Sequence, residues 1–171
     1  MKIITKNLYI KEYCFGSFRE QAFFLDNINS QKQLVLENTY GELYYSYVFY
    51  NSITQKKEFT LSFCSDFIKE NINICLWTNK NIVIISFDSY IYFIDNKEGR
   101  VVKEIGLTSP LIGFYQIDDN KMLVLEEAYI RTVSPYGEIV QDMKIDLIEN
   151  FTIQNDVLYV FSDNNKYVYK L

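Results

Sequence analysis

The sequence predicts an all-β fold, and three observations carry that prediction. The 171 residues include 15 Tyr and 13 Phe, which are residue types favoured in strands. Most apolar stretches are short and rich in Ile, Val, Tyr and Phe. Asn, Asp, Lys and Gly, which form the turns between strands, bound these stretches. Because 49% of the chain is hydrophobic, it can build a core, and we expect one domain over residues 1–171.

Charge and residue content exclude several classes of function. The formal net charge is −5, so we expect neither a nucleic-acid partner nor a membrane partner. The chain has no histidine, so catalysis and metal binding through imidazole are unavailable, and we expect no catalytic residue, metal or cofactor. Cys14, Cys64 and Cys75 are expected as small buried hydrophobic residues of a cytoplasmic protein. The start at residues 1–7 is too polar for a secretory leader.

The clearest strand pattern runs from residue 82 to residue 105. Strands are predicted at 82–86, 90–95 and 100–105, with a tight turn at 96–99 in which Gly99 takes a positive φ. The same order of strands and turns recurs downstream and, more weakly, upstream. The further predicted strands are 22–25, 34–37, 43–49, 58–63, 72–77, 111–117, 122–125, 129–133, 138–143, 151–153, 157–161 and 166–169.

These strands fall into a repeat. Equivalent strands start at residues 34, 82, 122 and 157, at spacings of 48, 40 and 35 residues. A period of about 40–45 residues with four short strands is typical of propeller blades. We therefore predict a small or partial (half) β-propeller-like array of antiparallel four-stranded blades, with another sandwich or barrel as the alternative. The four units are 21–63, 71–107, 109–146 and 148–171.

Residues 90–102 resemble the third and fourth strands of a propeller blade of the quinoprotein or Trp-Asp-repeat kind. The resemblance implies a scaffold with many functions. It is not specific, because the Trp-Asp dipeptide is absent, and no cofactor residue can be carried over. The fourth unit is one strand short. Residues 2–5 or 8–13 would close a small ring by supplying that strand, or the array stays open. Ser17 to Glu20 fits a capping box for a short helix, and 65–70 fits another helical turn.

Each unit carries an acid followed by a tyrosine in the turn after its first strong strand. In a propeller such turns share one face, where acids would steer a basic protein and tyrosines would anchor it. The alternative is that the tyrosines pack as strand residues while the acids only form turns. The candidate partner-binding residues are Glu37, Tyr40, Asp88, Tyr90, Glu126, Glu127, Tyr129, Asp163 and Tyr167.

A small, acidic, partial propeller without motifs is similar to some immunity proteins of bacterial contact-dependent growth inhibition systems. That resemblance implies a cytoplasmic, non-enzymatic protein that covers the active site of a basic nuclease toxin. One alternative is a carbohydrate- or small-ligand-binding module with exposed tyrosines and Trp77 as stacking platforms, although core packing is the favoured interpretation of Trp77. A hydrolase with paired carboxylates is a further alternative.

Overall fold

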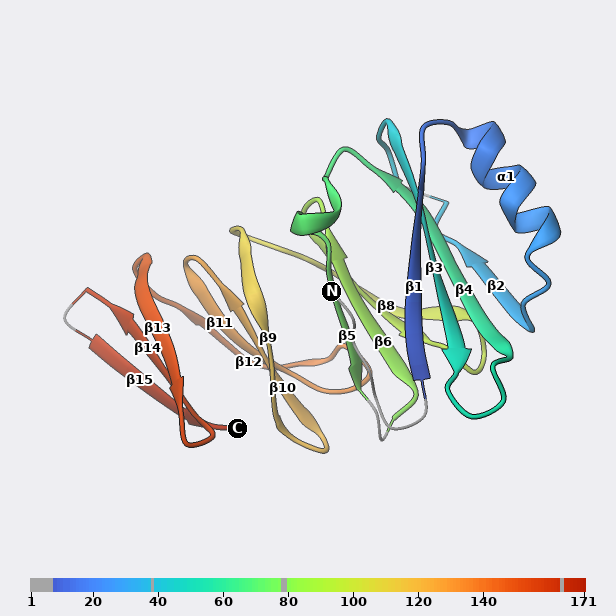
Figure 1. Cartoon of the computed structure of the whole chain (residues 1–171). Coiled ribbons are helices and arrows are strands. Elements are labelled where there is room, and N and C mark those ends of the chain that lie inside the picture. The colour runs from blue at the N-terminus through green and yellow to red at the C-terminus, as the bar shows by residue number, and fades with distance from the viewer. Residues whose placement is uncertain (1–7, 38, 78–79, 164) are drawn as a thin grey trace. The chain divides into compact units, whose positions relative to one another are not determined.

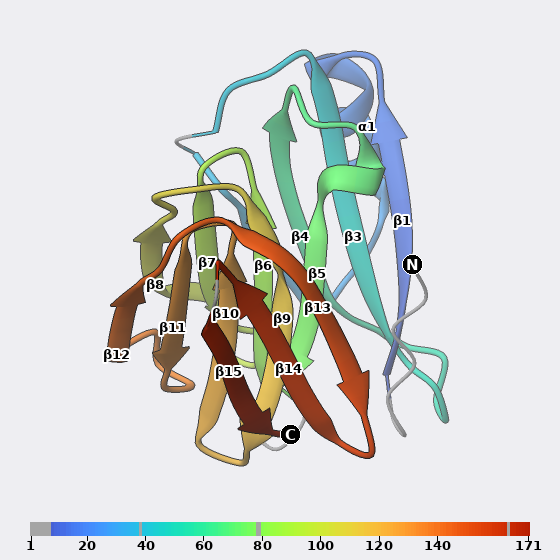
Figure 2. The ribbon, with the colours of Figure 1, turned by 90° about the vertical axis from the view of Figure 1, so that its left-hand side faces the viewer.

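The computed structural model describes residues 8–37, 39–77, 80–163 and 165–171. The described residues form 15 strands, one α-helix and one short 3₁₀ helix, so the predicted all-β class is confirmed (Figures 1 and 2). No helix in this part of the chain has the length and apolar character needed to cross a membrane. The chain divides into two compact units, Met1–Asp88 with Ile94–Val101 and Ser89–Phe93 with Val102–Leu171.

The first sheet of unit 1 departs from the predicted repeat. Its strand order is β1-β3-β4-β2, with β1 antiparallel to β3 and β2 parallel to β4. A meander would place consecutive strands side by side, so the expected equivalence between residue 34 and the later strand starts is wrong. The elements are β1 Leu8–Phe15, α1 Phe18–Asn27, β2 Lys32–Val35, β3 Leu43–Asn51 and β4 Lys57–Ser65.

Helix α1 occupies the segment 22–25, where we expected a strand, and its first turn shows why. The Ser17 hydroxyl accepts a hydrogen bond from the backbone N–H of Glu20 at 3.3 Å. The Glu20 carboxylate reaches back to accept from the backbone N–H of Gly16 at 3.0 Å. The predicted cap is confirmed, and it outweighs the strand propensity of the two phenylalanines that follow.

Aromatic packing forms the core of unit 1. The Phe63 ring stacks on Phe87 at 4.0 Å between centroids and on Tyr47 at 5.9 Å, and all three residues are buried. Trp77, at the end of β5 (Asn73–Trp77), is fully buried, so core packing is confirmed and an exposed stacking role is wrong. The 3₁₀ helix Lys69–Asn71 lies at the end of the segment where a helical turn was expected.

The second sheet has the meander order β5-β6-β7-β8, and the boundary between the units passes through β7 and β8. Strand β6 spans Ile82–Phe87, β7 Tyr90–Asp95 and β8 Arg100–Gly106, as predicted within two residues. In the turn between β7 and β8, Gly99 has φ +68° and donates its N–H to the carbonyl of Asp95 at 2.8 Å. The turn prediction is confirmed.

Unit 2 holds two further sheets. The first is a meander of order β12-β11-β10-β9, and the last is β13-β14-β15, with three described strands. The core of unit 2 is an aliphatic cluster that includes Leu123 and Leu125 of β10 and Leu158 and Val160 of β14. The strands are β9 Leu111–Asp118, β10 Lys121–Glu126, β11 Tyr129–Val133, β12 Ile139–Lys144, β13 Ile148–Gln154, β14 Val157–Ser162 and β15 Asn165–Lys170.

The N-terminal strand does not complete the last sheet. The prediction that residues 8–13 supply its fourth strand is wrong, because β1 pairs with β3 over its whole length, from Leu8 opposite Asn51 to Phe15 opposite Tyr44. The alternative segment, 2–5, lies outside the described residues. The last sheet is one strand short of the two meander sheets in the part of the chain that the structure describes, as predicted.

Candidate functional sites

In unit 2, the β10–β11 turn, which carries the predicted Glu127, is tied to the chain around it by backbone hydrogen bonds. Ile145, the first residue after β12, donates its N–H to the Ala128 carbonyl at 3.0 Å, and Ile148, the first residue of β13, donates to the Glu127 carbonyl at 2.8 Å. The linker before β9 accepts from the same turn, from Glu127 N–H to the Pro110 carbonyl at 2.9 Å. These backbone bonds hold the turn in place.

Glu126 is a core residue, and this corrects its assignment to the partner-binding set. Its side chain is fully buried, and its Oε2 accepts hydrogen bonds from the backbone N–H groups of Thr108 at 2.8 Å and Ser109 at 2.9 Å. Its Oε1 lies 2.8 Å from Arg131 Nη1 as an ion pair, without hydrogen-bond geometry. A carboxylate placed in this way cannot meet a partner.

Arg131 completes this polar cluster. Although it is only 5% exposed, its guanidinium donates from Nε to Asp142 at 3.1 Å, from Nη1 to the Gly106 carbonyl at 3.0 Å and from Nη2 to Thr108 Oγ1 at 2.6 Å. The cluster joins β10, β11, β12 and the linker before β9. Buried charges of this kind are tolerated because each is paired and hydrogen-bonded.

The other predicted residues have mixed exposure. Glu37, Glu127 and Asp163 are exposed, and Tyr40 is 82% exposed. Asp88, Tyr129 and Tyr167 are half-buried, and Tyr90 is 43% exposed. Asp88 accepts from the Ser65 hydroxyl at 2.7 Å, and the Tyr129 ring lies 5.2 Å from the Arg131 guanidinium carbon. Asp88 and Tyr129 thus have internal contacts, whereas Glu37, Tyr40 and Glu127 are presented to solvent.

The structure adds residues that the sequence pattern missed. Asp146 and Leu147 lie between the two residues that are bonded to the β10–β11 turn, and both are exposed, Leu147 by 65%. Glu149 follows at the start of β13 and is exposed as well. We call Glu127, Asp146, Leu147 and Glu149 the acidic end of unit 2. Asp146 and Leu147 lie in a linker rather than in a hairpin turn, so a pattern of acids in turns does not include them.

The three cysteines are free thiols, and their placement differs from the prediction. Cys14 is exposed, whereas Cys64 and Cys75 are half-buried. The Cys64 thiol donates to the Thr39 carbonyl at 2.8 Å, and burial raises the pKa of the Cys75 thiol. The expectation of three buried cysteines is therefore wrong. No group of three or more Cys, Asp or Glu suited to a metal ion occurs among the described residues.

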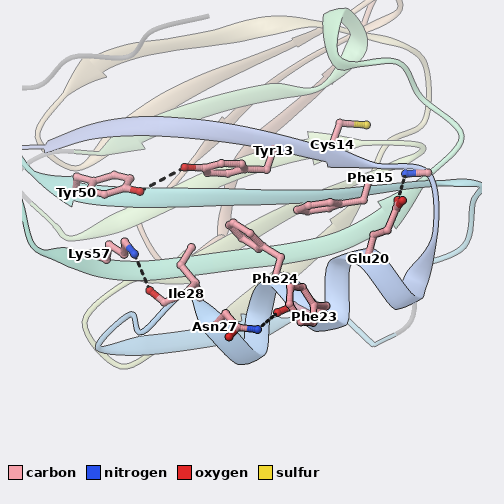
Figure 3. A pocket seen from close by; sticks show the side chains of 11 residues that line it. Tyr13, Cys14, Phe15, Glu20, Phe23, Phe24, Asn27, Ile28, Tyr50 and Lys57 are labelled. Atoms are coloured by element: carbon pink, nitrogen blue, oxygen red, sulfur yellow. Dashed lines mark hydrogen bonds between the residues drawn. The ribbon is translucent and has the colours of Figure 1, made fainter.

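Unit 1 contains a cleft of about 620 Å³ between helix α1 and the sheet strands β1, β3 and β4. Figure 3 shows α1 on one side and Tyr13, Phe15 and Tyr50 on the other. Along β1, Tyr13 and Phe15 turn toward the helix, while the Cys14 side chain points away from it (Figure 3). This alternation is the two-residue period of a strand. The cleft could not be predicted from the sequence, because residues 22–25 of α1 match a strand pattern.

Aromatic rings of α1 and the sheet pack together in the cleft, with Phe24 tilted at 41° to Tyr13 and 46° to Phe15. The Phe24 ring lies 4.6 Å from Tyr13 and 5.1 Å from Phe15, and Tyr50 stacks on Tyr9 at 4.8 Å. The Tyr50 hydroxyl lies 3.5 Å from the Tyr13 hydroxyl, and burial, together with Tyr13, raises the pKa of Tyr50. The Tyr50 hydroxyl is therefore protonated at neutral pH.

Charged groups stand at the two ends of the cleft. Lys57 lies beside Tyr50 and donates from its Nζ to the Ile28 carbonyl at 2.9 Å. Glu20 stands at the opposite end, beside Phe15 (Figure 3). Phe23, also in the lining, is 71% exposed. The cleft combines aromatic rings with one cation and one anion, the composition of many small-ligand sites.

Comparisons with known proteins establish the fold. No family model and no curated protein matches the chain. A solved Hsv2 from Kluyveromyces marxianus matches with TM-score 0.50 and 12% identity, over 81% of this chain and 46% of that one. The "KlHsv2 with loop 6CD replaced by a Gly-Ser linker" matches with TM-score 0.50 and 14% identity, over 75% and 44%. The chain thus spans less than half the length of these structures.

The class that these observations define is the β-propeller-like protein. Hsv2 is a β-propeller, and the chain, which has four sheets of three or four described strands, matches part of it. The predicted fold class, an all-β partial propeller-like fold, is confirmed. At 12–14% identity the likeness concerns the fold alone, because folds of this kind carry many unrelated functions.

Proposed function

We propose that the chain is a non-enzymatic binding module that docks a basic protein through the acidic end of unit 2. The observation that carries the proposal is the backbone bond from Ile148 to Glu127, which brings the exposed Glu127 to the segment that holds the exposed Asp146, Leu147 and Glu149. A second backbone bond, from Ile145 to Ala128, ties the same segment to the same turn. Exposed acids held close to an exposed apolar residue suit docking of a cationic partner.

Electrostatics supports the same proposal. The acids of the acidic end form no ion pair with a described residue, since both described ion pairs belong to Arg131. Their negative charge is therefore not neutralised by an ion pair, and it contributes to a net charge of −5. Such a field speeds encounter with a basic protein, and Leu147 would supply the desolvated contact that slows dissociation.

The finer proposal is that the partner is a bacterial nuclease toxin and that this chain is its immunity protein. Nucleases carry basic surfaces because their substrates are anionic, and an acidic binder competes for the same surface. The chain would act in the cytoplasm by steric occlusion of the toxin's active site, with no chemistry of its own. The net charge and the acidic end support this proposal over a carbohydrate-binding role.

The test begins with the genes beside the one for this chain, among which the proposal requires a toxin with a basic C-terminal domain. The domain is purified, its cleavage of RNA and DNA is measured, and the full chain is titrated in. We expect inhibition that is complete at one chain per domain, and loss of inhibition at equal concentration for the variant with Glu127→Lys and Glu149→Lys. Uninhibited cleavage, or absence of any basic protein encoded there, overturns the immunity proposal.

A matched control separates a specific surface from net charge. Glu98 and Glu138 are exposed glutamates outside the acidic end, in the β7–β8 and β11–β12 connections. The variant with Glu98→Lys and Glu138→Lys changes the net charge by the same amount. We expect it to inhibit like the unchanged chain. If both variants lose inhibition equally, the effect comes from overall charge, and the acidic end is not the docking surface.

A further inference from the structure

The cleft beside α1 has the size and wall chemistry of a small-molecule site. Its volume of about 620 Å³ falls within the range of roughly 300–1,000 Å³ that is usual for ligand pockets. All of its lining residues belong to unit 1, and none of them belongs to the acidic end of unit 2.

The aromatic lining of the cleft favours a ligand with a flat, apolar ring system. Phe24, Tyr13 and Phe15 present ring surfaces, with centroids 4.6 and 5.1 Å from Phe24, and Ile28 adds an aliphatic contact. Aromatic rings prefer to pack on other rings in offset or edge arrangements. Phe23, at 71% exposure, is a large apolar side chain that solvent does not favour, and a ligand in the cleft would cover part of it.

The Lys57 end selects an anion. The Lys57 ammonium uses one of its three donors on the Ile28 carbonyl and forms no ion pair with a described residue. The protonated Tyr50 hydroxyl belongs to the same end of the cleft (Figure 3). Glu20, the other charged residue in the lining, stands at the far end and accepts from the Gly16 N–H. An anionic group would therefore settle beside Lys57 and away from Glu20.

We propose that this cleft binds a small aromatic carboxylate, with the ring system against Phe24, Tyr13 and Phe15 and the carboxylate beside Lys57. The ring lies against these aromatic side chains, and Phe23 closes over its edge. The carboxylate accepts from the two remaining donors of Lys57, and a charge-assisted bond of this kind is stronger than one between neutral groups. The site gives the chain a small-molecule ligand besides its protein partner.

Naphthalene-2-carboxylate is the probe, and naphthalene-2-carboxamide is its neutral counterpart of the same shape. Each is titrated against the full chain by isothermal titration calorimetry. We expect saturable one-to-one binding of the carboxylate, tighter than that of the carboxamide. Lys57→Met should weaken the carboxylate about tenfold and change the carboxamide by less than about twofold. Phe23→Ala should weaken both ligands, because it removes apolar contact and no charge.

Two neighbouring residues supply matched controls. Lys56 is exposed and precedes Lys57 but does not line the cleft, and Phe18 is 66% exposed on the same helix, also outside the lining. Lys56→Met and Phe18→Ala should leave both affinities unchanged. No saturable binding, equal weakening by Lys56→Met and Lys57→Met, or equal affinity for the two probes overturns the proposal. Circular dichroism of each variant checks that the fold is kept.

Discussion

The sheet formed by β1 to β4 and the sheet formed by β9 to β12 bury polar groups in different ways. In the first, Gln21 donates to the Tyr45 and Phe63 carbonyls at 2.7 and 3.3 Å, and the Ser46 and Ser62 hydroxyls meet at 2.7 Å. In the second, the buried groups are charged, with the Glu126–Arg131 ion pair at 2.8 Å. Neutral groups accompany an aromatic core, whereas ions accompany an aliphatic one.

The difference follows from what each sheet must hold. The first sheet carries a helix, and Gln21 fixes α1 by donating to backbone carbonyls of β3 and β4. The meander sheet must instead hold the linker before β9, and Glu126 does so by accepting two of its backbone N–H groups. Four predictions, ordered by expected effect on stability, test this contrast.

The largest effect is expected for Phe63→Ala in the aromatic core. Phe63 is buried and stacks on both Phe87 and Tyr47, so its removal leaves a cavity that rigid rings cannot fill. We expect a loss of about 4 kcal/mol in the free energy of unfolding, measured by urea denaturation. A loss below about 1 kcal/mol would show that the stack contributes little to stability.

The next effect is expected for Arg131→Met in the meander sheet. The variant leaves Glu126 buried without its cation, and we expect a loss of about 3 kcal/mol. The double variant Glu126→Gln with Arg131→Met removes both charges and should recover part of this loss in the same denaturation assay. If the double variant is no more stable than Arg131→Met, the unpaired charge of Glu126 is not what destabilises the single variant.

A smaller effect is expected for the helix cap. Ser17→Ala removes the acceptor of the Glu20 N–H, and we expect a loss of about 1 kcal/mol. Ser17→Asp keeps an acceptor at the cap position and should restore most of the stability. The measurement is thermal unfolding followed by circular dichroism. Equal melting temperatures for the alanine variant and the unchanged chain would contradict the cap.

The smallest effect is expected at alkaline pH. Burial, together with Cys14, raises the pKa of Tyr45 to about 12, and the Tyr45 hydroxyl donates to the Phe67 carbonyl at 2.8 Å. The unfolded chain releases this proton near pH 10, so the stabilisation is complete below pH about 10 and is lost as pH rises toward 12. Tyr45→Phe should decline less steeply over this window in denaturation curves. If the free energy of unfolding falls equally steeply with pH in both proteins, the Tyr45 hydroxyl is not the source of the alkaline loss.

Local patterns predicted most of the fold. Strands β6, β7 and β8 and the Gly99 turn follow from residue types and spacing, and they form as expected. The first sheet was predicted poorly because its order depends on the capping of α1 and on a parallel pairing of β2 with β4. The sequence shows the cap, but it does not show which of two competing local preferences prevails, nor which distant strand an edge strand joins.

The candidate sites were predicted less completely. Glu127 was found by its place in a turn, whereas Glu126, one residue earlier, proved to be a core residue because strand alternation turns it toward Arg131. Asp146 and Glu149 join the site only through bonds between a linker and a distant turn. The cleft depends on α1 lying across β1, β3 and β4, which no local pattern specifies.

The most direct test of the central claim is the association rate with the basic toxin domain that the proposal requires beside this gene, measured at several salt concentrations. For the unchanged chain we expect the rate to fall steeply with salt, because the acidic end steers the encounter. For the variant with Glu127→Lys and Glu149→Lys we expect association at least about tenfold slower at low salt, with a shallower salt dependence. Equal rates and equal salt slopes for the two proteins would contradict docking through the acidic end.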